Sequence, residues 1–100
     1  MKPYSPKRVL LVDSWERTRI VRAVALRGQK VEVDAAASLT EALIFWRTGK
    51  YNLVLLTPRE TAQQSVEFFQ MIKQEKPDQQ VAFLVGAPGY LSFTIPAGFD

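Results

Sequence analysis

The side chains that most often carry out covalent chemistry are absent from this sequence of 100 residues. It contains no cysteine and no histidine. The chain alone therefore cannot form a disulfide, a zinc–thiolate site, or a Ser–His–Asp or Cys–His hydrolytic centre. Carboxylates and hydroxyls remain, but no set of nucleophile, base and orienting group can be assembled from them. We predict no enzymatic activity, no cofactor and no small-molecule substrate.

The charge of the chain is uneven along its length. The net charge is +3, and the first 30 residues hold eight Lys/Arg against two Asp/Glu, which gives +6. Residues 31–100 hold five Lys/Arg against eight Asp/Glu, which gives −3. A basic end of this kind is compatible with nucleic acid, with an acidic partner, or with a solvated face that has no partner.

Four segments predict strands. Continuous apolar runs at residues 9–12, 52–56 and 81–85 are typical of strands that are buried on both faces, as in a parallel sheet. Residues 31–35 alternate between apolar and polar, so this strand is expected at a sheet edge with one wet face.

Three helices are expected between these strands. Residues 15–27 follow Asp13-Ser14, which can supply an N-cap, and end before Gly28. A second helix begins at Ser38, which forms a capping box with Glu41, and runs through Arg47. The third spans about 62–75 and ends before Pro77. The core stripes expected on the three helices are Ile20, Val21 and Val24, then Leu39, Leu43 and Trp46, then Val66, Phe69 and Ile72.

Strands that alternate with helices predict a three-layer, doubly wound α/β fold with parallel strands 1–4, in one domain covering residues 1–100. The end of the chain differs. Pro88-Gly89 favours a tight turn, and residues 90–95 alternate. We therefore expect a last strand that returns antiparallel to the fourth in a hairpin.

Four segments together resemble the receiver domain of response regulators, the flavodoxin-like module of two-component signalling. They are VLLVDS at 9–14, DAAASLTEAL at 34–43, YNLVLLT at 51–57 and SVEFFQMIKQEKPDQQVAFLV at 65–85. The resemblance covers about residues 8–86, leaves 87–100 as an atypical tail, and implies sheet order 2-1-3-4-5. The chain lacks the length for the fourth helix, fifth parallel strand and fifth helix of such domains.

The resemblance also implies a phosphoacceptor pocket, which is degenerate here. Receivers phosphorylate an aspartate after strand three, with Mg²⁺ held by that aspartate and an acidic pair after strand one. The acidic pair is Asp13-Ser14, the acceptor position is Thr57, and the hydroxyl position after strand four is Val85. One carboxylate is a poor magnesium site, and Thr57 is a weak nucleophile without a base. We predict neither metal binding nor aspartyl phosphorylation.

Two helices carry more apolar and basic side chains than a core needs. Trp15, Arg19, Arg22 and Leu26 share one side of the first helix, away from its expected core stripe, and Ile44 and Phe45 add apolar surface to the second. These six residues form a candidate interface. The alternative is that they pack against neighbouring elements.

We therefore expect a pseudo-receiver that transmits signals by protein–protein contact, as a homodimer or with a partner. Two alternatives are an active phosphorelay receiver and a basic nucleic-acid adaptor, the latter disfavoured because no nucleic-acid-binding motif appears. No apolar run approaches the roughly 20 residues needed to cross a bilayer, and MKPYSPKR is no secretory signal. A cytoplasmic location without membrane contact is expected.

Overall fold

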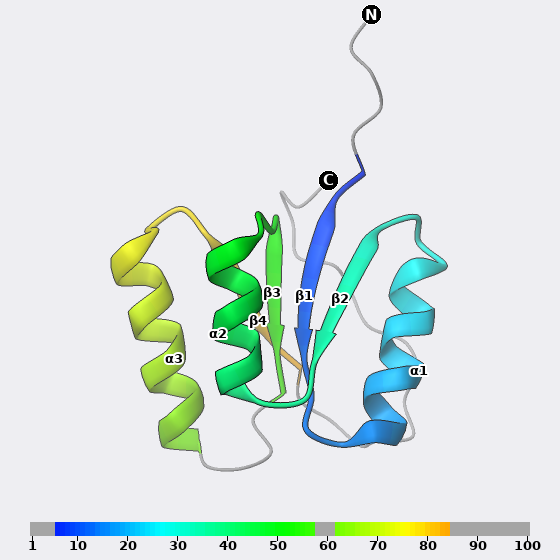
Figure 1. Cartoon of the computed structure of the whole chain (residues 1–100), viewed down its shortest axis with the longest axis horizontal. Helices are drawn as coiled ribbons and strands as arrows, with labels where there is room; N and C mark the ends of the chain where they lie inside the picture. Colours follow the sequence, from blue (N-terminus) through cyan, green and yellow to red (C-terminus); the bar gives the residue numbers. More distant parts are fainter. Residues whose placement is uncertain (1–5, 58–61, 85–100) are drawn as a thin grey trace, which may run out of the picture.

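Strands and helices alternate strictly along the chain, as the apolar pattern predicts. The computed structural model describes residues 6–57 and 62–84 (Figure 1). No helix in that part of the chain is long and apolar enough to span a membrane. The elements are β1 (Arg8–Val12), α1 (Glu16–Arg27), β2 (Glu32–Ala36), α2 (Leu39–Thr48), β3 (Leu53–Leu56), α3 (Ala62–Glu75) and β4 (Gln80–Phe83).

The four strands form one parallel sheet in the order β2-β1-β3-β4. This confirms the predicted order for strands 1–4 and the edge position of β2, which pairs only with β1 in the described sheet. The register places Val12 beside both Ala36 and Leu56, so these three strands end at the same edge. The predicted hairpin strand at 90–95 lies outside the described residues.

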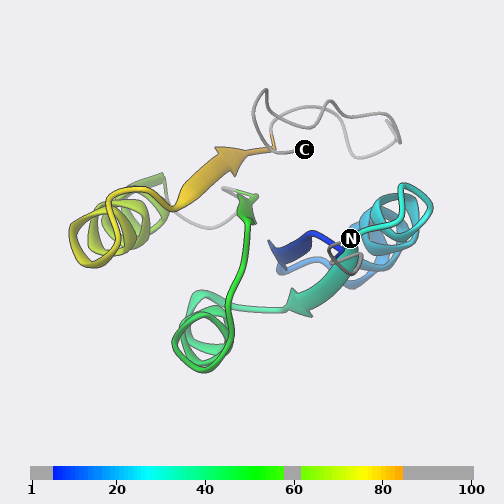
Figure 2. The same ribbon diagram turned by 90° about the horizontal axis from the view of Figure 1, so that it is seen from above.

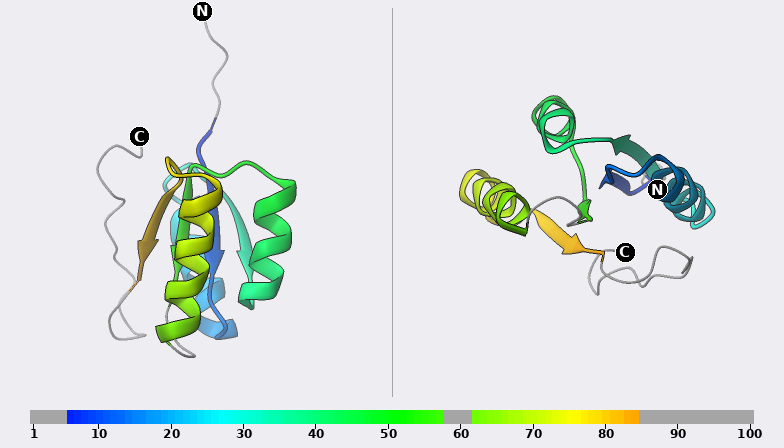
Figure 3. Two further views of the ribbon diagram at one scale, coloured as in Figure 1. Left: turned by 90° about the vertical axis from the view of Figure 1, so that its left-hand side faces the viewer. Right: turned by 90° about the horizontal axis from the view of Figure 1, so that it is seen from below.

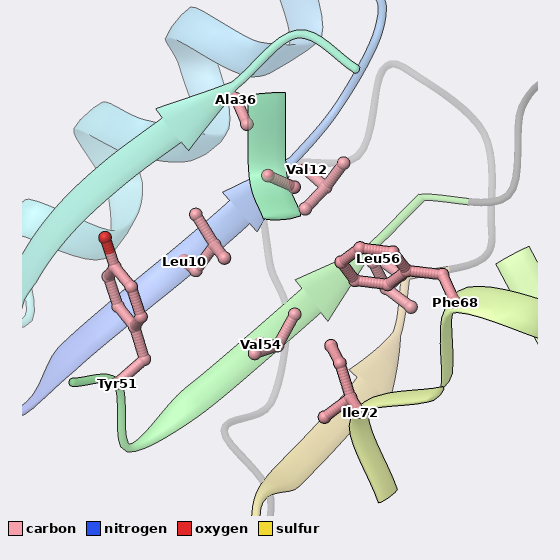
Figure 4. Packing of buried hydrophobic residues seen from close by; sticks show 9 residues of the cluster. Leu10, Val12, Ala36, Tyr51, Val54, Leu56, Phe68 and Ile72 are labelled. Atoms are coloured by element: carbon pink, nitrogen blue, oxygen red, sulfur yellow. The ribbon is translucent and has the colours of Figure 1, made fainter. Parts of the chain in front are cut away.

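Helices cover both faces of the sheet, with α1 on one face and α2 and α3 on the other (Figure 2). Alternate residues of the central strands supply the two cores. Val9 and Leu11 of β1 pack with Leu26 on the α1 side. Leu10 and Val12 pack with Ile72 on the α2–α3 side (Figure 4). A sheet buried on both faces requires the continuous apolar runs seen in the sequence.

The predicted core stripe of α1 is wrong. Ile20, Val21 and Val24 are 55%, 39% and 61% exposed, whereas Ala23 and Leu26 are buried against the sheet. The helix has apolar residues on two faces, so its periodicity alone does not decide which of them is buried. The small Ala23 lets the helix approach the sheet, and Leu26 fills the remaining space.

The predicted core residues of α2 and α3 agree better with the structure than those of α1. On α3, Val66 is exposed, and Phe68 takes the buried place beside Ile72 while Phe69 packs at the edge of the core. On α2, the expected Leu39, Leu43 and Trp46 do pack against the core. The predicted cap at Ser38 is confirmed, because its hydroxyl accepts a hydrogen bond from the Glu41 amide at 3.1 Å, while the Glu41 carboxylate accepts from the Ala37 amide at 3.2 Å rather than from Ser38.

A polar cluster joins β1, β2 and the start of β3 at the amino-terminal edge of the sheet. The Arg8 guanidinium lies 3.0 Å from an Asp34 carboxylate oxygen, and the Tyr51 hydroxyl donates to the same oxygen at 2.7 Å. The Arg8 guanidinium also lies 5.3 Å from the centre of the Tyr51 ring. This cluster ties three strands together on the side opposite the predicted pocket.

Tyr51→Phe is expected to lower the free energy of unfolding by about 1 kcal/mol at neutral pH, because it removes one hydrogen bond to a charged acceptor. Burial and then the bond to Asp34 raise the pKa of Tyr51 from 10.0 to about 12. The folded state thus holds the phenol proton more tightly than the unfolded state does. The contribution of the Tyr51 hydroxyl to the free energy of unfolding is therefore complete below pH 10 and is lost as the pH rises to 12. In urea unfolding, the gap between wild type and variant should narrow from about pH 8 to about pH 11. A gap that stays constant would contradict the role of the hydroxyl.

Candidate functional site

The residues that follow β1 and β3 meet at the carboxyl edge of the sheet. Because Val12 pairs with Leu56, Asp13 and Thr57 leave neighbouring strands at the same level. The backbone carbonyl of Val12 accepts hydrogen bonds from the Thr57 amide at 3.1 Å and from the Thr57 hydroxyl at 2.8 Å. The edge of a doubly wound sheet at such a point is where ligands of this architecture bind.

Asp13 is fully buried, and its carboxylate is held by the helix that follows it. One oxygen accepts the Trp15 backbone N–H at 3.0 Å. The other accepts the Thr18 hydroxyl at 2.5 Å and lies 2.8 Å from the Arg22 guanidinium, whose side chain is only 11% exposed. A buried charge is tolerated when it is paired and hydrogen-bonded in this way. The role of Asp13 is therefore to anchor the first turns of α1, although Trp15 rather than Asp13 or Ser14 occupies the N-cap position.

These residues do not fit a magnesium ion. The family resemblance implies a divalent cation at Asp13, but both oxygens of this carboxylate already accept hydrogen bonds, and the Arg22 cation lies beside one of them. Ser14 and Thr57 offer neutral hydroxyls where receivers have carboxylates. Among the described residues, no group of three or more His, Cys, Asp or Glu side chains could hold a metal.

Thr57 is poorly suited to accept a phosphoryl group. Its hydroxyl proton is directed to the Val12 carbonyl, which is not a general base. A carboxylate at this position would attack without losing a proton, whereas a threonine hydroxyl needs a base to remove it. The fourth predicted pocket residue, Val85, lies outside the described residues.

The candidate interface on α1 is corrected by the structure. Leu26 is fully buried in the sheet-side core, so it cannot be part of an exposed stripe. Arg22 is paired with Asp13, and the Arg19 guanidinium donates to the Asp13 backbone carbonyl at 3.0 Å. Of the α1 stripe, Trp15 alone is largely exposed, at 55%. The reason is that Asp13 attracts both arginines toward the sheet edge.

The two candidate interface residues on α2 differ in their exposure to solvent. Ile44 is 61% exposed, whereas Phe45 is half-buried and packs against the core. The functional residue that sequence reasoning missed is Thr18, whose hydroxyl completes the shell of Asp13. The spacing of the residues indicates this role, because Thr18 and Arg22 are four residues apart and share one face of a helix that begins soon after a buried aspartate.

The fold and sequence are similar to known response regulators. A response regulator from Thermotoga maritima shares 29% identity with this chain at a TM-score of 0.71, covering 79% of this chain and 66% of its own. The regulator TrrA, in a complex with the histidine kinase ThkA, shares 28% identity at a TM-score of 0.71 over 77% of this chain and 66% of its own.

A third structure supports the fold alone, because its identity is lower. TrrA from Thermotoga maritima, solved with Mg²⁺ and BeF, shows 23% identity and a TM-score of 0.73 over 81% of this chain and 87% of its own. No family model matches the sequence, and no curated protein is significantly similar to it. The parallel order β2-β1-β3-β4 and these similarities confirm the predicted fold and the predicted resemblance to the receiver domains of response regulators.

Proposed function

We propose that this receiver domain transmits signals by protein–protein contact without aspartyl phosphorylation. The observation that carries the proposal is the Asp13–Arg22 pair at 2.8 Å. In place of an ion shared by several carboxylates, the site has one carboxylate neutralised by a guanidinium from its own chain. Thr57, with its hydroxyl bonded to Val12, supports the same conclusion.

Incubation with acetyl phosphate and Mg²⁺, followed by intact-mass measurement, tests the absence of phosphorylation. We expect no gain of a phosphoryl group on the wild-type chain. The variant Thr57→Asp restores the carboxylate at the acceptor position, and we expect it to stay unmodified as well, because the Asp13 carboxylate remains paired with Arg22. An active receiver in the same reaction serves as the positive control. A stable mass gain on the wild-type chain would overturn the proposal in favour of an active phosphorelay receiver.

The exposed face of α1 supports self-association. Ile20, Val21 and Val24 form an apolar stripe that faces solvent, a pattern more typical of an interface than of a solvated helix. The similar regulator TrrA has been crystallised with the histidine kinase ThkA, which supports protein partners in general. By contrast, two arginines that nucleic-acid binding would need, Arg19 and Arg22, are engaged by Asp13.

Light scattering at micromolar concentration is expected to show a homodimer that Val24→Glu converts to a monomer. Ile44→Glu on α2 is the matched control, because Val24 and Ile44 are both 61% exposed and belong to helices that cover opposite faces of the sheet (Figure 2). We expect it to leave the dimer intact. A monomeric wild type would contradict self-association, and loss of the dimer only in Ile44→Glu would assign the contact to α2.

A further inference from the structure

A hollow of about 450 Å³ lies between α2 and α3 at the carboxyl edge of the sheet. The two helices stand on the same side of the sheet (Figure 3), and the ends of β1 and β3 close the hollow from behind. Its volume falls in the range of sites that hold small molecules. It adjoins the degenerate pocket, since Ser14 and Thr57 form part of its wall, but most of its lining belongs to the two helices.

The inner wall of the hollow is apolar. Leu39 and Leu43 come from α2, Phe68 and Met71 from α3, and Val12 and Leu56 from the strand ends. Figure 4 shows the Phe68 ring beside Leu56 at this edge of the core. An aromatic ring and a thioether on one wall favour a flat, unsaturated ligand, because rings stack on phenylalanine and contact sulfur favourably.

A buried hydroxyl faces the same space. Ser65 is only 6% exposed, lies on the side of α3 that carries Phe68 and Ile72, and lines the hollow. A serine hydroxyl can both donate and accept hydrogen bonds. A ligand with a hydroxyl or amine that reaches Ser65 could therefore bond to its hydroxyl.

Two further hydroxyls leave part of their hydrogen-bonding capacity for a ligand. The Ser38 oxygen accepts from the Glu41 amide, so its proton is available to a ligand acceptor. The Thr57 proton goes to Val12, so its oxygen can accept from a ligand donor. Glu67, a lining residue on α3, offers a carboxylate to a cationic group of a ligand.

We propose that the hollow binds a small aromatic molecule that is neutral or cationic and carries a hydroxyl or amine. The ring lies against Phe68, Met71 and Leu43, and a polar group bonds to Ser65. The amine, where present, lies toward Glu67. This site is independent of the proposed lack of phosphorylation, and a ligand in it would rest against Thr57, where receivers carry their acceptor.

Tyramine is the probe for this site, and 4-hydroxyphenylacetate is its match with the charge reversed. Titration of the isotopically labelled full chain, followed by amide NMR shifts, should give a dissociation constant on the order of 1 mM for tyramine and weaker binding for the acid. The shifted amides should be those of the lining residues on α2 and α3. Absence of binding up to about ten times that concentration, or shifts confined to other elements, would overturn the proposal.

Four variants separate a real site from surface binding. Ser65→Ala should weaken tyramine about 5-fold by removing the hydroxyl, and Ser65→Leu should abolish binding by filling the hollow. Thr40→Trp, at an exposed lining position, blocks the mouth even where Ser65→Leu disturbs the fold. Glu67→Gln should remove the preference for tyramine over the acid. Unchanged affinity in both Ser65→Leu and Thr40→Trp, with the chain folded by circular dichroism, would place the probe elsewhere and refute the site.

Discussion

Replacing Arg22 with methionine is expected to lower the free energy of unfolding by about 3 kcal/mol. Methionine keeps the apolar stem of arginine but removes the guanidinium that lies 2.8 Å from the buried Asp13 carboxylate. Asp13 would keep its bonds from Trp15 and Thr18, but its charge would lose the cation that compensates for burial. The measurement is urea unfolding followed by circular dichroism.

The control for this experiment is the double variant Asp13→Asn with Arg22→Met. Asparagine is close in size and retains an acceptor for the Trp15 amide or the Thr18 hydroxyl, without a buried charge. We expect the double variant to recover most of the stability that Arg22→Met loses, because replacing both members of a buried pair costs far less than removing one. A single variant that loses less than about 1 kcal/mol would show that the pair does not hold the edge of the site.

Leu26→Ala is expected to lower the free energy of unfolding by about 3 kcal/mol, whereas Val24→Ala on the same helix should change it by less than about 0.5 kcal/mol. Leu26 is completely buried against the sheet, so its truncation leaves a cavity in the core on the α1 side. Val24 is 61% exposed, and alanine is the better helix former.

This pair of variants distinguishes the two orientations of α1 that the sequence allows. The predicted core stripe requires Val24 to be the costly position and Leu26 to be tolerant. Because the proposed dimer would bury Val24, the two variants are compared at a protein concentration at which light scattering shows a monomer. Equal, large losses at both positions under that condition would contradict the described orientation of α1. A loss for Val24→Ala that appears only at higher protein concentration would support the proposed dimer.

The strands were predictable because each central strand contains a short apolar run, and their order was implied by the resemblance to receiver domains. Residues 9–12 and 53–56 are continuous apolar runs typical of strands buried on both faces between helices, and the alternating 31–35 segment marked the edge. The cap at Ser38 was equally local, since it joins two residues that are three positions apart. Such features depend on near neighbours in the chain, which the sequence displays directly.

The orientation of α1 could not be obtained in this way. Its apolar residues occupy two faces, and the choice between them depends on a group outside the helix. Asp13, buried at the end of β1, attracts Thr18 and Arg22, and this turns Leu26 to the sheet and Val24 to solvent. The prediction that Val66 on α3 is buried was wrong for a related reason, because Phe68 and Ile72 already fill the space against the sheet.

The sequence by itself determined the parallel α/β architecture and the presence of a threonine rather than a carboxylate at position 57, because both follow from residue types at fixed places along the chain. Only the tertiary structure decided what Asp13 does instead. Its carboxylate is neutralised by Arg22, nine residues later, because the helix that follows β1 folds back over the strand end. A side chain's electrostatic partners depend on which elements meet in space, and periodicity along one element does not contain that information.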